Sequence, residues 1–484
     1  PVEPLRREKS SVYKGLTVAA KSVIPPEVLR AAIGSRLSVE LFTESESTAQ
    51  YALDRLGVLL GLKFPRAVEL GEAETLIDLG PLSVGVRRMD PLSKFVDHAA
   101  DRQRPKEAAD AQVELIMSSL SQATLPTITL VEISESGRYA GNSRSAEVKS
   151  ALRHRLLSTG RISRFVATEA QRQSNARQSN EREFYRARFS AAVDDLFRQL
   201  GVRQLALPLP APKTLTCHPA LLAIWMIQQD GRSSTGLQRQ VPIAVLSDPT
   251  GQRVLVRTPK TDWKPIHLGL IEIYREHCSA DLEYKTNDIY QFIKNVTEDA
   301  ARTFPDVLLL THAQNLRRAW KFLSNGNLGL DTIEFDADSR RPISTLSGLR
   351  HIRVRTADYN ETPECYGIND EGVGQPTGLW RYPEELRLFA STSGKPATAA
   401  SASISVSKLT SGIHNGSLIR LNPKAQVWNE QVVELLVAGL QSGDRPERWA
   451  ALAHNLRGAE PYSHWMTPLP WPLSLAQRIE KYIF

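Results

Sequence analysis

The sequence has few cysteines and no long apolar run. Only three of its 484 residues are cysteine, and they form neither a CxxC pair nor a Cys/His pair at metal-ligand spacing. This excludes a disulfide framework and a structural zinc site, and it predicts a reducing compartment, the cytoplasm. The longest uninterrupted apolar run, residues 220–227, is far shorter than the roughly 20 residues that cross a bilayer. We therefore expect no membrane partner.

The motifs of several enzyme classes are also missing. The sequence contains no GxxxxGK[ST] phosphate loop, no GxGxxG after a strand, no GxSxG elbow and no HExxH helix. Nucleotide hydrolysis, dinucleotide chemistry, serine hydrolysis and zinc proteolysis are therefore unsupported. Hydrophobic residues make up 41% of the chain and charged residues 23%, which is the usage of folded globular domains. The sequence predicts a folded protein without these activities.

What the sequence does have is a concentrated positive charge. The net charge of the whole chain is +7, yet residues 138–188 alone hold twelve basic residues against four glutamates, a local charge of +8. Such a cluster attracts polyanions, of which nucleic acid is the commonest. The basic residues flank an apolar, strand-like segment, residues 162–166, which favours a nucleic-acid surface. A solvated helix face explains the charge about equally well.

The first half of the chain predicts a small α/β domain. Strand patterns alternate with helix patterns, which is typical of a largely parallel sheet. The expected strands are residues 36–42, 127–133 and 162–167, and the expected helices are residues 49–62, 145–157 and 181–200. A proline-rich run at 207–213 cannot continue a helix or a central strand. We therefore divide the chain into an N-terminal extension (1–20), a first domain (21–206), a linker (207–215) and a second domain (216–484).

The second half predicts a ribonuclease-H-like α/β fold. A hairpin of residues 242–247 and 252–258 turns at 248–251, and a continuous apolar strand follows at 306–311. Further expected strands are residues 349–356 and 386–391. The expected helices are residues 265–277, 286–302, 314–323, 429–440, 445–456 and 473–482. A hairpin followed by helix, buried strand and helix is the order that this fold requires.

Several short motifs in this order resemble the MID and PIWI halves of Argonaute proteins. The likeness is greatest to the bacterial PIWI-RE branch, which is named for characteristic Arg and Glu residues. The motifs are AQNLRRAW at 313–320, RHIRVR at 350–355 with ETPE at 361–364, GLWR at 378–381, PLPWPL at 468–473 and the ending YIF at 482–484. The resemblance implies a Rossmann-like MID domain packed on an RNase-H-like PIWI domain. It also implies a protein that holds a short guide strand by its 5′ end and pairs it with a target.

The resemblance implies a 5′-phosphate pocket in the MID half. Segments 147–149 and 162–165 are similar to those that carry the Lys and Gln of the family's Tyr-Lys-Gln-Lys pattern, which places Lys149 and Arg164 there. Arg198 lies near the second Lys, and Ser145 replaces the Tyr. Arg offers a forked set of donors to a phosphate, so the chemistry survives the substitution. The family also directs the terminal carboxylate, here of Phe484, toward this pocket, where it can hold Mg²⁺. Arg153 and Arg161 are further expected nucleic-acid contacts.

The PIWI half offers four more arginines. Arg353 and Arg355 are two residues apart on a predicted strand and project to one face, where they could meet successive phosphates. Arg317 and Arg318 lie early in a helix, so one should face inward and the other outward. Glu361 and Glu364 are the expected acidic partners. An internal ion pair between Arg353 and one of these glutamates is an equally good interpretation of that arginine.

Carboxylates for cleavage are scarce. RNase-H-type hydrolysis requires carboxylates that converge on two divalent cations, and active Argonautes place one Asp within the first strand and another after the fourth. The expected first strand, residues 243–247, has none, and Asp248 belongs to a turn. The fourth ends in Thr311 and His312. We expect guide-dependent binding without cleavage, in bacterial defence against foreign DNA beside a helicase and a nuclease. The alternatives are an active guided endonuclease, and a basic scaffold that binds nucleic acid and protein partners without a guide.

Overall fold

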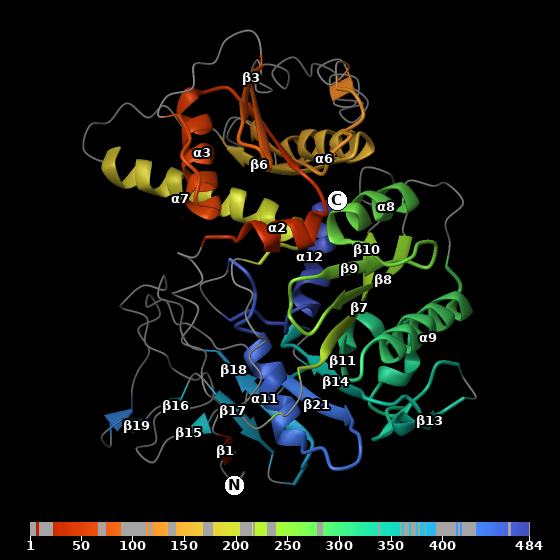
Figure 1. Cartoon of the computed structure of the whole chain (residues 1–484). Coiled ribbons are helices and arrows are strands. Elements are labelled where there is room, and N and C mark those ends of the chain that lie inside the picture. The colour runs from red at the N-terminus through yellow and green to blue at the C-terminus, as the bar shows by residue number, and fades with distance from the viewer. Residues whose placement is uncertain are drawn as a thin grey trace.

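A computed structural model gives the fold of most of the chain. It describes residues 6–8, 23–65, 74–88, 113–114, 118, 120–133, 142–167, 178–203, 215, 218–229, 239–277, 284–336, 339–358, 361–362, 367–368, 374–375, 378–382, 384–393, 413–414, 417–418, 432–462 and 466–483. Two domains stack on one another, the first coloured red to yellow and the second green to blue (Figure 1). Within these residues no helix is both long enough and apolar enough to cross a membrane.

The first domain is a three-layer α/β unit. Its five-stranded sheet has the order β3-β4-β2-β5-β6, in which β4, β2, β5 and β6 run parallel and β3 pairs antiparallel at the edge. The strands are β2 (Leu37–Thr43), β3 (Thr75–Asp78), β4 (Leu82–Arg88), β5 (Thr127–Ile133) and β6 (Arg161–Ala167). The helices are α2 (Pro26–Ile33), α3 (Glu46–Leu60), α6 (Asn142–Ser158) and α7 (Gln178–Gln199). Every residue of β5 is buried, as expected of a parallel strand covered on both faces.

The helices of this domain cover opposite faces of its sheet. α3 and α7 pack together on one face, where Tyr51 and Phe189 lie 5.7 Å apart between ring centroids. α6 covers the other face through Leu152 and Leu156, which pack against Val131. The strand β6 therefore forms an edge of the sheet with a helix on each side of it.

The second domain is built on a ten-stranded sheet with the order β1-β17-β18-β21-β14-β11-β7-β8-β9-β10. The strands β7, β11 and β14 run parallel in its middle, and the other pairs are antiparallel. The long strands are β7 (Ala220–Gln229), β8 (Arg239–Ser247), β9 (Val254–Arg257), β11 (Val307–His312), β14 (Leu349–Arg355), β17 (Gly378–Arg381), β18 (Leu388–Thr392) and β21 (Val433–Gly439). The short ones are β1 (Arg6–Glu8) and β10 (Lys264–Pro265).

Helices cover both faces of this larger sheet. The helices are α8 (Ile266–His277), α9 (Thr286–Thr303), α10 (Ala313–Leu316), α11 (Pro446–Leu456) and α12 (Leu473–Ile483), with 3-10 turns η2 (Lys321–Leu323) and η3 (Ile343–Thr345). Two-residue strands form three further pairs: β12 (Thr332–Ile333) with β13 (Arg341–Pro342), β15 (Gly367–Ile368) with β16 (Gly374–Gln375), and β19 (Ile413–His414) with β20 (Ser417–Leu418). The apolar core of the first domain continues into the face covered by α8, α11 and α12, while α9 and the segment after α10 cover the other face.

Three of the expected elements differ from the observed ones. The predicted helix at 429–440 is wrong, because β21 occupies the sheet between β14 and β18. A short, continuously apolar segment fits a buried helix and a buried strand equally well. The predicted helix at 314–323 is broken after Leu316. The strand expected to be first in this domain, residues 243–247, is β8, and the first one after the linker is β7. The predicted hairpin is confirmed, because β8 and β9 pair antiparallel.

Candidate nucleic-acid interface

Four basic side chains gather around the edge strand β6. Lys149 and Arg153 are one turn apart on α6, Arg164 lies on β6, and Arg188 lies on α7. Burial, together with the charges of Arg153, Arg164 and Arg188, lowers the pKa of Lys149. Burial and the charge of Arg164 lower the pKa of Arg153 to about 10. Each cation thus raises the electrostatic cost of the others, which an anion placed among them would relieve. We call these four residues the β6 cluster.

One carboxylate and the end of α12 lie beside the β6 cluster. Asp195 Oδ2 is 3.4 Å from Arg164 Nε, and Tyr482 donates a hydrogen bond of 3.0 Å to Asp195 Oδ1. The last turn of the chain that the structure describes therefore reaches this site, in the space between the two domains (Figure 1). Phe484, whose carboxylate the resemblance directs here, lies outside the described residues, as does the side chain of Ser145.

Two arginines expected at this site are internal ion-pair residues instead. Arg161, which is 6% exposed, has its Nε 2.8 Å from a Glu40 oxygen. Arg198, which is 8% exposed, pairs with Asp195, and its Nε lies 2.8 Å from Glu460 Oε1. Carboxylates and carbonyls of the protein already surround both guanidinium groups, so neither is presented to a ligand here, and phosphate contact stays a prediction for both. The phase of α7 turns Arg198 toward α12, and the alternation along β6 turns Arg161 away from Arg164.

A second polar site lies at the carboxyl ends of the parallel strands β7, β11 and β14. The Trp225 ring stacks on the His312 ring with centroids 5.3 Å apart and planes 9° apart. His312 Nε2 is 3.1 Å from Thr356 Oγ1, which donates a hydrogen bond of 2.6 Å to Asp358. Burial lowers the pKa of His312 to about 4, so the imidazole is neutral near pH 7.

The carboxylates near this sheet do not converge. The strand β7 contains no Asp or Glu. Asp248 accepts hydrogen bonds from Thr250 and from the Arg253 amide, which close the hairpin turn. Asp306 pairs with Arg350 at the amino end of β11. Among the residues that the structure describes, no three His, Cys, Asp or Glu side chains gather closely enough to hold a metal ion.

The arginines of the second domain are paired with its glutamates and carbonyls. Arg317 donates two hydrogen bonds, of 2.6 and 2.5 Å, to the Glu361 carboxylate. The bond from Arg317 lowers the pKa of Glu361. Arg355 lies 3.1 Å from Glu434 and donates to the Glu361 carbonyl at 2.7 Å. Arg318 is exposed, and Glu364 lies outside the described residues.

Arg353 is buried rather than presented to a ligand. It is 5% exposed and donates to the Leu323 carbonyl at 3.0 Å and to Asn325 Oδ1 at 2.8 Å. Burial lowers its pKa to about 10. Arg353 is therefore held inside the protein, with a carbonyl and an amide as its partners rather than Glu361, and its contact with a phosphate stays a prediction.

Sequence reasoning missed several members of these sites. Arg188 and Asp195 are seven residues apart on α7, so both can face β6, but only the register between α7 and β6 reveals this. Trp225 was hidden in a run of apolar residues, and Glu434 in the segment expected to be a helix. The only signal for Asp358 was its position just after a strand rich in arginine.

Comparison with known families agrees with this geometry. A model described as the RNaseH domain of pPIWI_RE matches residues 221–484, and one described as the MID domain of pPIWI_RE matches residues 87–208. No curated protein matches the chain. The expected resemblance and the expected fold class are confirmed.

Solved structures of Argonaute and Piwi proteins are similar over nearly the whole chain. A. aeolicus Argonaute is 11% identical (99% of this chain, 53% of that one, TM-score 0.45) and Drosophila Piwi is 10% identical (97% and 50%, TM-score 0.47). Clostridium butyricum Argonaute bound to a guide DNA and a 19-mer target DNA is 7% identical (99% and 52%, TM-score 0.45). The chain thus spans about half the length of these proteins. The RNaseH-domain model by itself matches more than half of the sequence. The chain therefore belongs to the pPIWI_RE family and combines an Argonaute-like MID domain with an RNase-H-like PIWI domain.

Proposed function

We propose that this protein binds the phosphorylated 5′ end of a short guide strand at the β6 cluster and pairs the guide with a complementary target. The observation that carries the proposal is the convergence of Lys149, Arg153, Arg164 and Arg188 around one strand edge, with Asp195 as the nearby carboxylate. A terminal phosphate carries up to two negative charges. Its negative charge would offset the burial and the repulsion that together lower the pKa of Lys149, and Arg164 would supply a forked donor set.

We propose that the guide phosphate shares a Mg²⁺ ion with the β6 cluster. Mg²⁺ is commonly held by one or two carboxylates together with phosphate oxygens and waters. Asp195 Oδ2 is buried and accepts no hydrogen bond among the described residues, although Arg164 Nε lies 3.4 Å from it, and Tyr482 donates a hydrogen bond to the same carboxylate. Asp195 and the terminal carboxylate of Phe484 are the ligands that we propose. The ion would add positive charge opposite the phosphate.

We propose further that the protein binds its target without cutting it. Two-metal hydrolysis requires carboxylates that place two cations about 3.5 to 4 Å apart. Here β7 supplies none, Asp306 is paired with Arg350 at the other end of β11, and the place after β11 holds the buried, neutral His312. A helicase and a nuclease would then supply the chemistry in bacterial defence against foreign DNA, within the cytoplasm.

Guides with and without a 5′ phosphate test the binding proposal. Lys149→Ala and Arg164→Ala should each weaken binding of a phosphorylated guide by about 1.5 to 3 kcal/mol, the range for hydrogen bonds to charged groups. Binding of a 5′-hydroxyl guide should hardly change. Arg186→Ala is the matched control, because this exposed arginine belongs to the same basic segment and pairs with Asp54 at 3.6 Å. Fluorescence anisotropy with labelled guides measures all three.

Three results would contradict the proposals. An equal loss for both kinds of guide in Lys149→Ala would mean general attraction to the backbone, and nucleic acid of mixed length in the purified protein would favour a guide-free scaffold. Incubation of the guide-loaded protein with a matched target and Mg²⁺ or Mn²⁺ should leave the target intact. Cleavage at one position that disappears in Asp248→Ala would establish a nuclease.

A further inference from the structure

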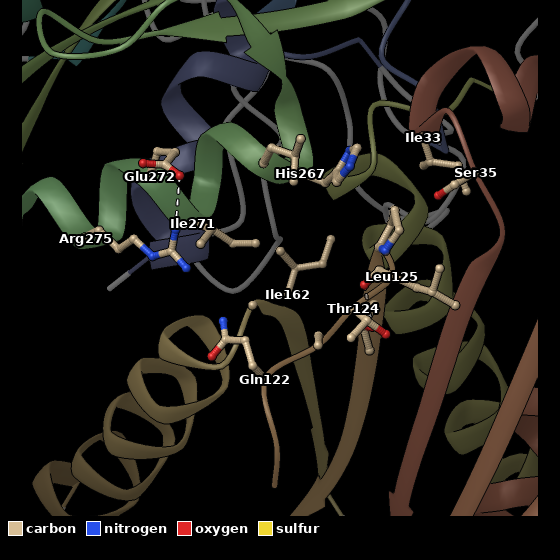
Figure 2. A pocket seen from close by; sticks show the side chains of 15 residues that line it. Ile33, Ser35, Gln122, Thr124, Leu125, Ile162, His267, Ile271, Glu272 and Arg275 are labelled. Carbon is tan, nitrogen blue, oxygen red and sulfur yellow. Dashed lines mark hydrogen bonds and ion pairs between the residues drawn. The ribbon is translucent and has the colours of Figure 1, made fainter.

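A cavity of about 360 Å³ lies between the two domains. The first domain contributes the end of α2, the segment just before β5 and the beginning of β6, and the second domain contributes one side of α8 (Figure 2). None of the four residues of the β6 cluster lines it. The volume is at the lower end of the range of small-molecule sites, about 300 to 1,000 Å³.

Aliphatic side chains from both domains form much of the wall. Ile33 and Leu125 come from the first domain, Ile162 from the start of β6, and Ile271 from α8, and all four are labelled in Figure 2. Apolar walls of this kind bind apolar ligand surface, because removing apolar surface from water is favourable.

One buried polar group of the wall has no partner. His267 is 4% exposed, and its Nδ1 atom is buried without a hydrogen-bond partner among the described residues. Burial lowers the pKa of this imidazole to about 4, so the ring is neutral near pH 7. An orphaned buried nitrogen costs free energy in the folded protein, and a ligand in the cavity can remove that cost once the ring turns this atom toward it.

The other polar side chains of the wall are either uncharged or already ion-paired. Gln122 and Thr124 offer an amide and a hydroxyl (Figure 2). At the α8 side, Arg275 lies 3.1 Å from Glu272, so these two charges are already paired with each other. A charged ligand would lose its hydration and find no free counter-charge among these groups. The site therefore favours an uncharged ligand.

We propose that this cavity binds a small, uncharged nitrogen heterocycle, a nucleobase or a nucleoside. Such a molecule has two apolar faces and an edge that carries both donors and acceptors. Its faces would lie against Ile162, Leu125 and Ile271, and its edge would pair with the His267 imidazole and the Gln122 amide. An amino acid or a sugar phosphate would bring charge that the wall does not match, and a lipid chain would leave His267 without a partner.

The ligand would touch both domains at once. Because it contacts β6 and α8 together, it stabilises the arrangement of the domains against their separation, by an amount that grows with ligand concentration. This inference stands apart from guide binding, because a nucleoside lacks the phosphate that the β6 cluster is proposed to hold.

Calorimetric titration of the whole chain with adenosine, guanosine, cytidine, uridine and free adenine tests the proposal. At least one of them should bind saturably and raise the midpoint of thermal unfolding. His267→Phe keeps a ring of similar shape but removes the nitrogens, so it should weaken binding at least tenfold while the ligand-free protein stays as stable as the wild type or gains stability. Leu125→Trp, which fills the cavity, should abolish binding. Leu76→Trp, at a 73% exposed position on β3, is the matched control and should bind normally.

Several outcomes would overturn the proposal. These are no saturable binding of any of the five compounds, binding that is unchanged in both His267→Phe and Leu125→Trp, and binding that appears only when a 5′ phosphate is added. Lys149→Ala separates the two proposals, because it should weaken binding of a phosphorylated guide but leave nucleoside binding as it is.

Discussion

The same residue type lies in two contrasting settings in this protein. Around β6, Lys149, Arg153, Arg164 and Arg188 lie near one another, and burial together with the charges of the three arginines lowers the pKa of Lys149. At the carboxyl end of β14, Arg317 and Arg355 each lie against a glutamate. An arginine that faces a carboxylate contributes to the fold, whereas a group of cations near one another contributes a potential that attracts an anion. The two settings differ in the balance of charge: in the β6 cluster four cations lie near Asp195, which is 3.4 Å from Arg164, whereas Arg317 and Arg355 lie against Glu361 and Glu434.

The largest expected effect is the loss of the buried ion pairs that join the domains. Arg198→Ala removes the buried cation that pairs with both Asp195 and Glu460, and breaking such a buried pair costs about 3 to 5 kcal/mol. Denaturant unfolding measures the loss. Arg302→Ala is the control, because its side chain is 74% exposed in an i,i+3 pair with Asp299 and should cost at most about 1 kcal/mol. Equal effects of the two substitutions would show that Arg198 does not join the domains.

The next effect should separate an internal arginine from a binding one. Arg353→Ala removes the donor of the Leu323 carbonyl and of Asn325, and an unsatisfied buried group costs about 1 to 3 kcal/mol. The affinity of the folded fraction for nucleic acid should stay unchanged, as measured by anisotropy after urea titration has fixed the folded fraction. A stable Arg353→Ala variant that binds nucleic acid poorly would show that Arg353 contributes to nucleic-acid binding.

A smaller effect should appear in the pH dependence of stability. The hydrogen bond from Arg317, assisted by the charges of Arg355 and His312 if protonated, lowers the pKa of Glu361. A carboxylate with a depressed pKa contributes stability above its unfolded value of about 4.3, and this is lost as the pH falls through the folded value. Wild type should therefore exceed Glu361→Gln in unfolding free energy at pH 6, and the difference should shrink below about pH 4. A difference that is the same at every pH would contradict the ion pair.

The smallest effect should be visible only in the salt dependence of binding. Arg318 is exposed beside the paired Arg317. If it meets a phosphate, Arg318→Ala should lower the slope of log affinity against log salt by about one unit without altering sequence preference. Binding measured at several salt concentrations gives the slope, and an unchanged slope would exclude the contact.

Lys149 and Arg164 show how much of the candidate site could be predicted from the sequence. The family resemblance predicted both from short local segments, and the structure brings them together near Arg188. Arg198 was expected beside them, but its direction depends on the contact of α7 with Glu460, a residue more than 250 positions later. The pairing of Tyr482 with Asp195 joins residues 287 positions apart. No local pattern contains such contacts.

The fold was predictable where local pattern and tertiary setting agree. Alternation in β2 and the turn residues at 248–251 indicated a strand and a hairpin, and both are present. The strand β21 is buried on both faces and is apolar except for Glu434, so it lacks the alternation of a half-buried strand. The first strand of the larger sheet was missed for the same reason, because β7 is apolar throughout residues 220–227.

The outermost strand of the larger sheet, β1, must wait for its partner strand while the chain is being synthesised. Arg6–Glu8 form β1, which pairs with β17 at Gly378–Arg381, so the two halves of this ladder are separated by most of the chain. At about 5 to 20 residues per second of synthesis, β1 waits on the order of 20 to 70 s for its partner. The first domain is complete long before then. Because β17 is itself joined to the sheet through β18 and β21, which follow it in the chain, β1 is among the last strands to find its place.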